Sequence, residues 1–156
     1  MRKPRVILCD DDVIILNMLE LFFKKRGYEV LRYSSPVVCQ FKYLADSCKN
    51  LGPCADVIIS DYKMPGMTGL ELFQRQSEIG CKADCKMKAI MTGYADEDIV
   101  KMCKDSGYRY FHKPFTLSEL SGWLSQCEKL LDLSQQLNDR RLDTYDNIKQ
   151  DTLSIA

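Results

Sequence analysis

Four short apolar runs in this sequence each lead into a residue type that can bind or accept a phosphate. The residues that follow the runs are Asp10, Asp11 and Asp12, then Asp61, then Thr92, and finally Lys113. In an open parallel sheet, ligands bind in the crevice outside the carboxyl ends of the strands. If the runs are parallel strands, these side chains meet at one edge of the sheet. Such a set suits the metal-assisted transfer of a phosphoryl group to an aspartate.

The pattern of apolar residues predicts strands and helices in strict alternation. Short apolar runs predict five strands, over residues 6–9, 28–33, 56–60, 88–92 and 108–112. Apolar residues at helical spacing, with capping residues at their ends, predict helices over residues 13–26, 36–50, 69–80 and 95–106, and a last one from Thr116 or Ser118 to Leu131. This alternation is typical of a parallel sheet with helices on both faces, so the predicted class is α/β.

Length and charge narrow the class of protein. A chain of 156 residues suggests one domain, and 22 basic residues balance 22 acidic ones. This balance gives no reason to expect binding to nucleic acid or to a membrane surface. The N-terminal residues do not resemble a signal peptide, and no apolar stretch is long enough to span a bilayer. We therefore expect a cytoplasmic protein.

The chain contains eight cysteines, and none of them forms a C-x-x-C pair. Four lie in apolar patterns and are expected in the core: Cys9, Cys39, Cys103 and Cys127. The other four flank predicted loops: Cys48, Cys54, Cys81 and Cys85. A zinc or iron–sulfur site built from these four is an alternative, but their spacing favours reduced thiols.

The sequence around the four strand ends resembles the receiver domains of response regulators, the phospho-acceptor modules of two-component signalling. The matching segments are Cys-Asp10-Asp11-Asp12, Ser-Asp61-Tyr-Lys-Met-Pro-Gly, Met-Thr92-Gly and Phe-His-Lys113-Pro-Phe. They occur in the family's order and at its spacing, and the similarity covers about residues 4–135. It implies a five-stranded, doubly wound parallel sheet of the flavodoxin (CheY-like) type.

The resemblance also implies a role for each acid. Asp61 is then the phospho-acceptor, Asp11 and Asp61 bind Mg²⁺ directly, Asp10 acts mainly through a water, and the backbone carbonyl of Lys63 supplies another ligand. The chemistry agrees, because two carboxylates about 4 Å apart repel by roughly 4 kcal/mol at a near-surface dielectric. Mg²⁺ relieves such repulsion, since it takes one or two carboxylates and a phosphate oxygen. Asp12 is interpreted as the N-cap of the first helix and not as a metal ligand.

Two further residues are predicted to hold the phosphoryl group. Lys113 contacts one oxygen as a point charge, and the hydroxyl of Thr92 binds another. In the family, the bond between the lysine and the following proline is usually cis, which directs the lysine into the site. The family also has a mobile aromatic three residues before the lysine, so Tyr110 is expected to act as a switch together with Thr92.

The resemblance implies partners on both sides of the reaction. The single histidine, His112, lies on a predicted strand, so the phosphate must come from another protein, a sensor histidine kinase or a phosphotransfer protein. The expected output is a protein contact, through self-dimerisation or docking of a partner on the fourth helix, fifth strand and fifth helix. We expect no enzymatic activity beyond phosphorylation of Asp61 and hydrolysis of the product.

Two other functions have to be weighed. A phosphatase of the haloacid-dehalogenase type would use Asp10 as nucleophile and Asp12 as general acid, but the acidic pair that it needs after its lysine is absent after Lys113. It would also leave the segment 61–66 unexplained. A degenerate receiver that acts only as a binding module is the other alternative, and the intact set of acids, threonine and lysine argues against it.

Residues 136–156 form a polar tail with irregularly spaced apolar side chains. The pattern is too irregular for a coiled coil. We expect either an extension of the last helix or a linker to an output domain that this sequence does not contain.

Overall fold

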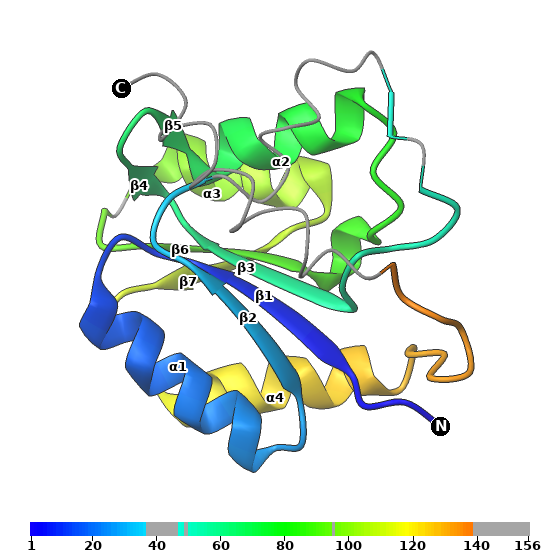
Figure 1. Ribbon diagram of the computed structural model, residues 1–156. Helices are drawn as coiled ribbons and strands as arrows, with labels where there is room; N and C mark the ends of the chain where they lie inside the picture. Colours follow the sequence, from blue (N-terminus) through cyan, green and yellow to red (C-terminus); the bar gives the residue numbers. More distant parts are fainter. Residues whose placement is uncertain (37–46, 49, 95, 139–156) are drawn as a thin grey trace, which may run out of the picture.

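The computed structural model describes residues 1–36, 47–48, 50–94 and 96–138. Its centre is a parallel sheet in the order β2-β1-β3-β6-β7 (Figure 1). The strands are β1 (Arg5–Cys9), β2 (Glu29–Tyr33), β3 (Val57–Asp61), β6 (Lys88–Thr92) and β7 (Arg109–His112). This is the order of a doubly wound sheet of the flavodoxin type, so the predicted fold class is confirmed. Residues 63–64 (β4) and 67–68 (β5) add a short antiparallel pair.

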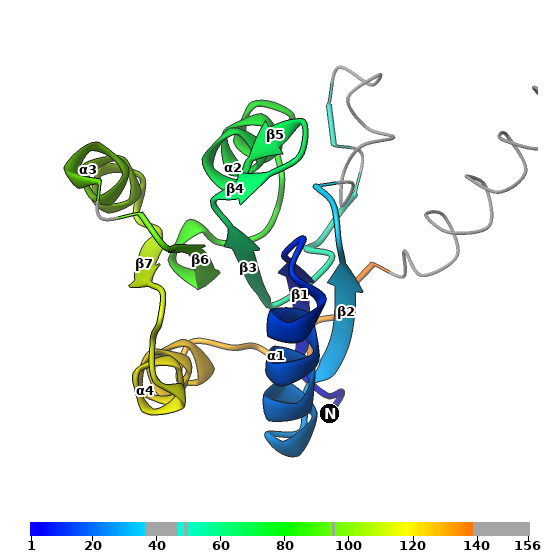
Figure 2. The same cartoon turned by 90° about the vertical axis from the view of Figure 1, so that its left-hand side faces the viewer.

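Helices cover both faces of the sheet, as the views in Figures 1 and 2 show. The helices are α1 (Val13–Lys25), α2 (Gly69–Glu78), α3 (Glu97–Ser106) and α4 (Leu117–Glu128), and a short 3₁₀ helix spans Cys85–Met87. α1 and α4 lie on one face, and α2 and α3 lie on the other. The helix predicted over residues 36–50 lies mostly outside the described residues.

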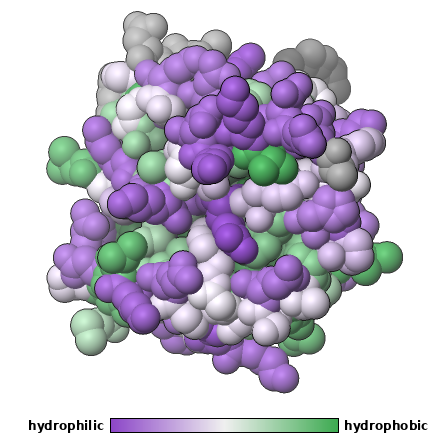
Figure 3. All heavy atoms as spheres, turned by 180° about the vertical axis from the view of Figure 1, so that it is seen from behind, coloured by the Kyte–Doolittle hydropathy of each residue, from purple (hydrophilic) through white to green (hydrophobic). Residues whose placement is uncertain are grey.

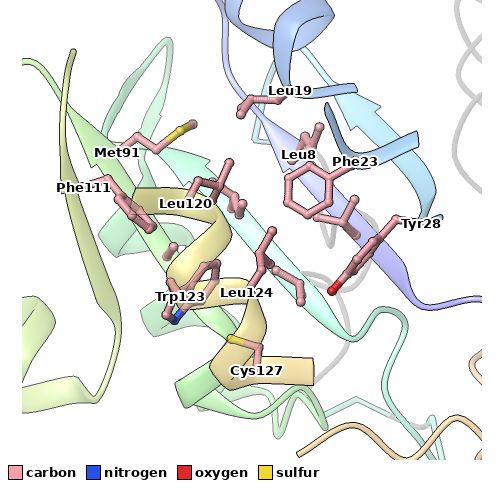
Figure 4. Close-up of a cluster of buried hydrophobic side chains, with 14 of the residues drawn as sticks. Leu8, Leu19, Phe23, Tyr28, Met91, Phe111, Leu120, Trp123, Leu124 and Cys127 are labelled. Atoms are coloured by element: carbon pink, nitrogen blue, oxygen red, sulfur yellow. The ribbon is translucent and has the colours of Figure 1, made fainter. Parts of the chain in front are cut away.

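Side chains alternate between two apolar cores along each central strand. In β1, Val6 and Leu8 point into the core beneath α1 and α4, whereas Ile7 and Cys9 join the core beneath α2 and α3. All five residues of this strand are buried, because helices cover both faces of a parallel sheet. Figure 4 shows the first core, where Phe23 of α1 and Leu124 of α4 lie over Leu8.

The predicted N-cap Asp12 and the helix start at Thr116 are confirmed, and with Thr68 these residues fix where helices begin beside the carboxyl edge of the sheet. The carboxylate of Asp12 accepts the Ile14 N–H, which caps α1. Thr68 and Thr116 each form a capping box with a glutamate three residues later. The helix predicted from residue 95 begins instead at Glu97, because the carboxylate of Asp96 caps it through the Asp98 N–H.

The last helix is shorter than predicted. α4 ends at Glu128, three residues before the predicted end, and residues 129–138 are not helical. Within the described part of the chain, every helix is too short or too polar to cross a bilayer. The surface seen from behind is mostly hydrophilic, with small separate apolar areas (Figure 3).

Three of the four cysteines predicted in the core, Cys9, Cys103 and Cys127, are buried, and Cys39 lies outside the described residues. No disulfide bond joins any two of the seven cysteines within the described ranges. In those same ranges, the only group of three side chains close enough to hold a metal ion is formed by aspartates. The geometry therefore gives no support to a zinc or iron–sulfur site made from cysteines.

Candidate functional site

The carboxyl edge of the sheet brings together residues that are far apart in the sequence. Asp10 follows β1, Asp61 ends β3, Thr92 ends β6 and Lys113 follows β7. The ammonium nitrogen of Lys113 lies 2.8 Å from Asp10 Oδ2 and 3.1 Å from Asp61 Oδ1. The Lys113 N–H also donates to the Thr92 carbonyl at 2.7 Å, which fixes the lysine backbone against β6. The Lys113–Pro114 bond is cis, as the resemblance implied.

Three carboxylates form the floor of this site. One oxygen from each of Asp10, Asp11 and Asp61 lies within 4.8 Å of the others. Asp10 has no exposed surface, Asp61 is buried, and Asp11 is exposed. Mg²⁺ prefers oxygen ligands, usually one or two carboxylates together with waters, so the donor set fits this ion. Asp12 is not part of the group, because its carboxylate caps α1.

The electrostatics of the site set Asp61 apart from an ordinary surface aspartate. Burial, and then the negative charge of Asp10, raise the pKa of Asp61 to about 6, although the ammonium of Lys113 works in the opposite direction. Burial also disfavours the charge on Lys113, but its hydrogen bond to Asp10 and the charges of both acids outweigh burial and raise its pKa. The site therefore holds more negative charge than one lysine neutralises, which favours a bound cation.

The loop after Asp61 is held tightly against the site. The Tyr62 N–H donates to the Met91 carbonyl at 2.7 Å, and the Gly69 N–H donates to the Tyr62 carbonyl at 2.8 Å. Gly69 stands so close to β3 that a Cβ atom there would lie 2.4 Å from the Asp61 carbonyl oxygen. A glycine at the start of α2 is therefore required for Asp61 to keep its position.

Tyr94 is a residue that sequence reasoning missed, and it connects three of the predicted site residues. Its N–H donates to Thr92 Oγ1 at 3.0 Å, and its carbonyl accepts the hydroxyl of Tyr110 at 3.1 Å. The ammonium of Lys63 donates to its hydroxyl at 3.1 Å and lies 5.3 Å from its ring centre. Nothing in the local sequence indicates these contacts, because they depend on how the ends of β6, β7 and the β4–β5 pair meet in the fold.

Exposed apolar side chains lie on α1, directly after the acidic cluster. Ile14, Met18 and Leu21 lie at helical spacing on one side of α1, and Ile14 is 76% exposed. The buried residues of the same helix, Leu16, Leu19 and Phe23, face the core. An apolar stripe beside a charged site is suited to contact with another protein.

Comparison with known proteins places this site in context. A model of the response regulator receiver domain matches residues 6–124. The chain is 28% identical over 122 residues to sporulation initiation phosphotransferase F of Bacillus subtilis, covering 77% of this chain and 90% of that protein. It is 29% identical over 121 residues to the transcriptional regulatory protein AruR of Pseudomonas aeruginosa, covering 75% of this chain but only 46% of that protein.

Solved structures give the same likeness. A response regulator receiver domain protein from Clostridium thermocellum has a TM-score of 0.64 and 27% identity, covering 83% of this chain and 99% of that one. The chemotaxis response regulator CheY4 of Vibrio cholerae has a TM-score of 0.61 and 25% identity, covering 81% of this chain and 99% of its own.

Proposed function

The chain belongs to the family of response regulator receiver domains, and on that premise we propose that it accepts a phosphoryl group on Asp61 with Mg²⁺ bound beside it. The observation that carries this proposal is the position of Asp61, which shares the ammonium of Lys113 with the fully buried Asp10. Two carboxylates, a third exposed acid and one lysine provide both a nucleophile and the charges needed to hold an incoming phosphate.

In the proposed reaction, a carboxylate oxygen of Asp61 attacks the phosphorus of a phosphohistidine. The new phosphorus–oxygen bond forms as the phosphorus–nitrogen bond breaks, and the leaving imidazole keeps the electron pair and takes up a proton. Lys113 balances charge on one phosphoryl oxygen, and the Thr92 hydroxyl donates to another. Asp11, Asp61 and the Lys63 carbonyl would hold Mg²⁺, and the ion would neutralise the remaining charge of the phosphoryl group.

The donor that we propose is a histidine kinase or a phosphotransfer protein. The exposed side chains of Ile14, Met18 and Leu21 on α1 support this, because they offer an apolar contact beside the acidic cluster. A donor that docks there would bring its phosphohistidine to the mouth of the site. The exchange is between two proteins of the cytoplasm, and the chain acts on no other substrate than its own Asp61 and the phosphate that it carries.

The proposed output is a contact made by α3, β7 and α4. Val100 and Met102 are exposed on α3. The hydroxyl of Tyr110 on β7 donates to the carbonyl of Tyr94, whose own N–H donates to the hydroxyl oxygen of Thr92. Phosphorylation adds about two negative charges next to Thr92. Movement of that loop toward the phosphate would pull on Tyr110 and change the face, which a second copy of this chain or a separate protein then binds.

The test is labelling with acetyl phosphate, a small acyl phosphate, in the presence of Mg²⁺, followed by mass spectrometry of peptides. Wild type should gain one phosphoryl group on the peptide that contains Asp61, and chelation of Mg²⁺ should prevent it. Asp61→Asn should remain unlabelled. Asp12→Asn is the matched control, because asparagine keeps the helix cap and removes a neighbouring charge; it should label as wild type does.

These two variants, together with Asp10→Asn, separate this function from a phosphatase that uses Asp10. Such an enzyme would lose its nucleophilic chemistry in Asp10→Asn, be impaired in Asp12→Asn and tolerate Asp61→Asn. Full labelling of Asp61→Asn would refute the proposed acceptor.

A further inference from the structure

The chain does not continue as a helix after α4 but folds back along the domain. Residues 129–138, here called the C-terminal strap, leave α4 and run past the N-terminal residues toward the start of β3 (Figures 1 and 2). The strap is anchored by two different arginines, Arg2 near its middle and Arg5 at its last residue. Neither contact belongs to the acid site, which lies at the other end of the strands.

The guanidinium group of Arg2 contacts both the strap and Asp56, the residue before β3. Its two terminal nitrogens donate to the two oxygens of Asp56, each at 2.7 Å. Its Nε donates to the Gln135 carbonyl at 2.5 Å, and one terminal nitrogen also approaches the Asp132 carbonyl at 3.4 Å. A forked pair with a carboxylate fixes the plane of the group, so the donors that reach the strap are held in direction as well as in distance.

The far end of the strap is bound at a second point. Arg5, which is buried, donates to the Asn138 carbonyl at 2.9 Å while its Nε donates to Glu29 at 2.8 Å. The Asn138 N–H donates to the Pro53 carbonyl at 3.1 Å, and its side-chain amide donates to the Gly52 carbonyl at 2.6 Å. Asn138 therefore uses its backbone and its side chain to bind the domain.

These anchors lie at the amino ends of β1 and β3, two of the strands whose carboxyl ends lead to the acid site. Arg5 begins β1, and Asp10 follows its other end; Asp56 precedes β3, and Asp61 ends it. The two sites are thus separated by the length of a buried strand. The strap also ends beside the loop before β3, on the part of the sheet away from β7.

We propose that Arg2 and Arg5 clamp the C-terminal strap to the amino ends of β1 and β3, and that this clamp is independent of the state of the acid site. The independence from the acid site rests on the proposed function, whereas the clamp does not.

Amide hydrogen exchange of the full chain, followed by mass spectrometry, tests the clamp. In wild type, peptides covering residues 132–138 should be protected, because the Asn138 N–H is bonded to Pro53. Arg2→Ala removes the charged group that donates to the Gln135 and Asp132 carbonyls, and it should speed exchange in the strap about tenfold or more. Lys3→Ala is the matched control, since it removes an exposed positive charge from the same segment and should leave the strap protected. Asn138→Ala, which weakens the strap from its own side, should give a smaller increase.

The second arm repeats the measurement with Mg²⁺ and beryllofluoride, a stand-in for the phosphoryl group. Peptides around Thr92 should change, and those of the strap should not. Wild-type protection in Arg2→Ala would overturn the clamp, and a change of strap exchange caused by beryllofluoride would overturn its independence. If no peptide responds to beryllofluoride, the proposed function fails and takes the independence with it, while the result for Arg2→Ala still decides the clamp.

Discussion

The ammonium of Lys113 lies 2.8 Å from Asp10 Oδ2, and the side chain of Asp10 has no contact with solvent. The other oxygen of Asp10 accepts the Asp12 N–H at 2.8 Å, so both oxygens of this buried carboxylate are engaged. The pair therefore has a structural role beside the role in phosphate binding that we propose for it. Removing the lysine leaves a buried charge whose remaining described partner is a backbone N–H, and such charges are costly.

Lys113→Met keeps most of the side-chain volume and removes the charge. We expect the free energy of unfolding to fall by about 3 kcal/mol in EDTA, because Asp10 and Asp61 then face each other without the ammonium. Mg²⁺ should recover part of this loss, since it neutralises the same carboxylates. Urea unfolding with and without Mg²⁺ measures both values. Lys101→Met, at an exposed position on α3, is the control and should change neither. An equal loss in both conditions would contradict a shared role of lysine and metal.

Thr92 and the single tryptophan, Trp123, offer a test of the switch. Thr92 is 1% exposed, and Trp123 packs edge-on against Phe111 of β7, with ring centres 5.7 Å apart. Fluorescence of Trp123 therefore reports on β7 and α4. In Thr92→Val, which has the same shape but no hydroxyl, the change caused by beryllofluoride and Mg²⁺ should disappear, whereas Thr92→Ser should keep it. A wild-type response in Thr92→Val would show that the hydroxyl does not transmit the signal.

The central strands and helix caps could be predicted because their causes are local. Strand β1 is a continuous apolar run, and Asp12, Thr68 and Thr116 cap helices through residues only two or three positions away. The predicted third strand stopped one residue early, at Ser60. In the structure, Asp61 is itself part of β3 and is in register with Met91. The sequence pattern ended the strand at the charge, but the pairing with β6 includes it.

Features that depend on distant parts of the chain could not be predicted. The short pair β4 and β5 has only two residues in each strand, too few to show a period. The contacts of Tyr94 join residues of β4, β6 and β7, and the strap depends on Arg2 reaching Gln135, 133 positions away in the sequence. Polar residues in these places have the composition of ordinary surface loops, so only the folded arrangement identifies them.

Gly69 and Gly122 make a matched pair of helical glycines. A Cβ atom at Gly69 would meet the Asp61 carbonyl at 2.4 Å and Ser60 Oγ at 2.9 Å, whereas one at Gly122 would meet nothing within 4 Å. We expect Gly69→Ala to lower the free energy of unfolding by about 1–3 kcal/mol and to weaken beryllofluoride binding, because β3 must shift. Gly122→Ala should raise stability by about 0.5–1 kcal/mol. Urea unfolding measures both changes, and a Gly69→Ala variant more stable than wild type would contradict the close contact.

A salt bridge between Arg26, the C-cap of α1, and Glu128 of α4 predicts that the free energy of unfolding depends on pH. Arg26 donates to both oxygens of Glu128 at 2.7 and 2.9 Å, and these bonds lower the pKa of Glu128 below its ordinary value. The stability that Glu128 contributes is therefore present above the unfolded pKa of about 4.3 and is lost as the pH falls through the lower folded value. Glu128→Gln should cost about 1 kcal/mol at pH 7. That cost should shrink below about pH 4.

Urea midpoints at pH 7, 5 and 3 measure this difference between wild type and variant. Asp105→Asn, at an exposed position near the end of α3, should differ from wild type by the same small amount at each pH. If the cost of Glu128→Gln stays constant down to pH 3, the ion pair contributes nothing through its charge.

The buried and repelled carboxylate of Asp61 predicts that the acid site lowers the free energy of unfolding. Burial and the negative charge of Asp10 raise the pKa of Asp61 to about 6, so its carboxylate, although mostly ionised at neutral pH, destabilises the folded state. In EDTA at pH 7.5, Asp61→Asn should be more stable than wild type by about 2 kcal/mol, because the neutral amide is not repelled. Thermal unfolding should show a higher midpoint for the variant. Adding Mg²⁺ should raise the midpoint of wild type and affect Asp61→Asn much less, since a cation stabilises the folded state in proportion to its binding. Asp12→Asn should follow wild type in both conditions. A variant less stable than wild type in EDTA would mean that the hydrogen bond from Lys113 outweighs the repulsion from Asp10.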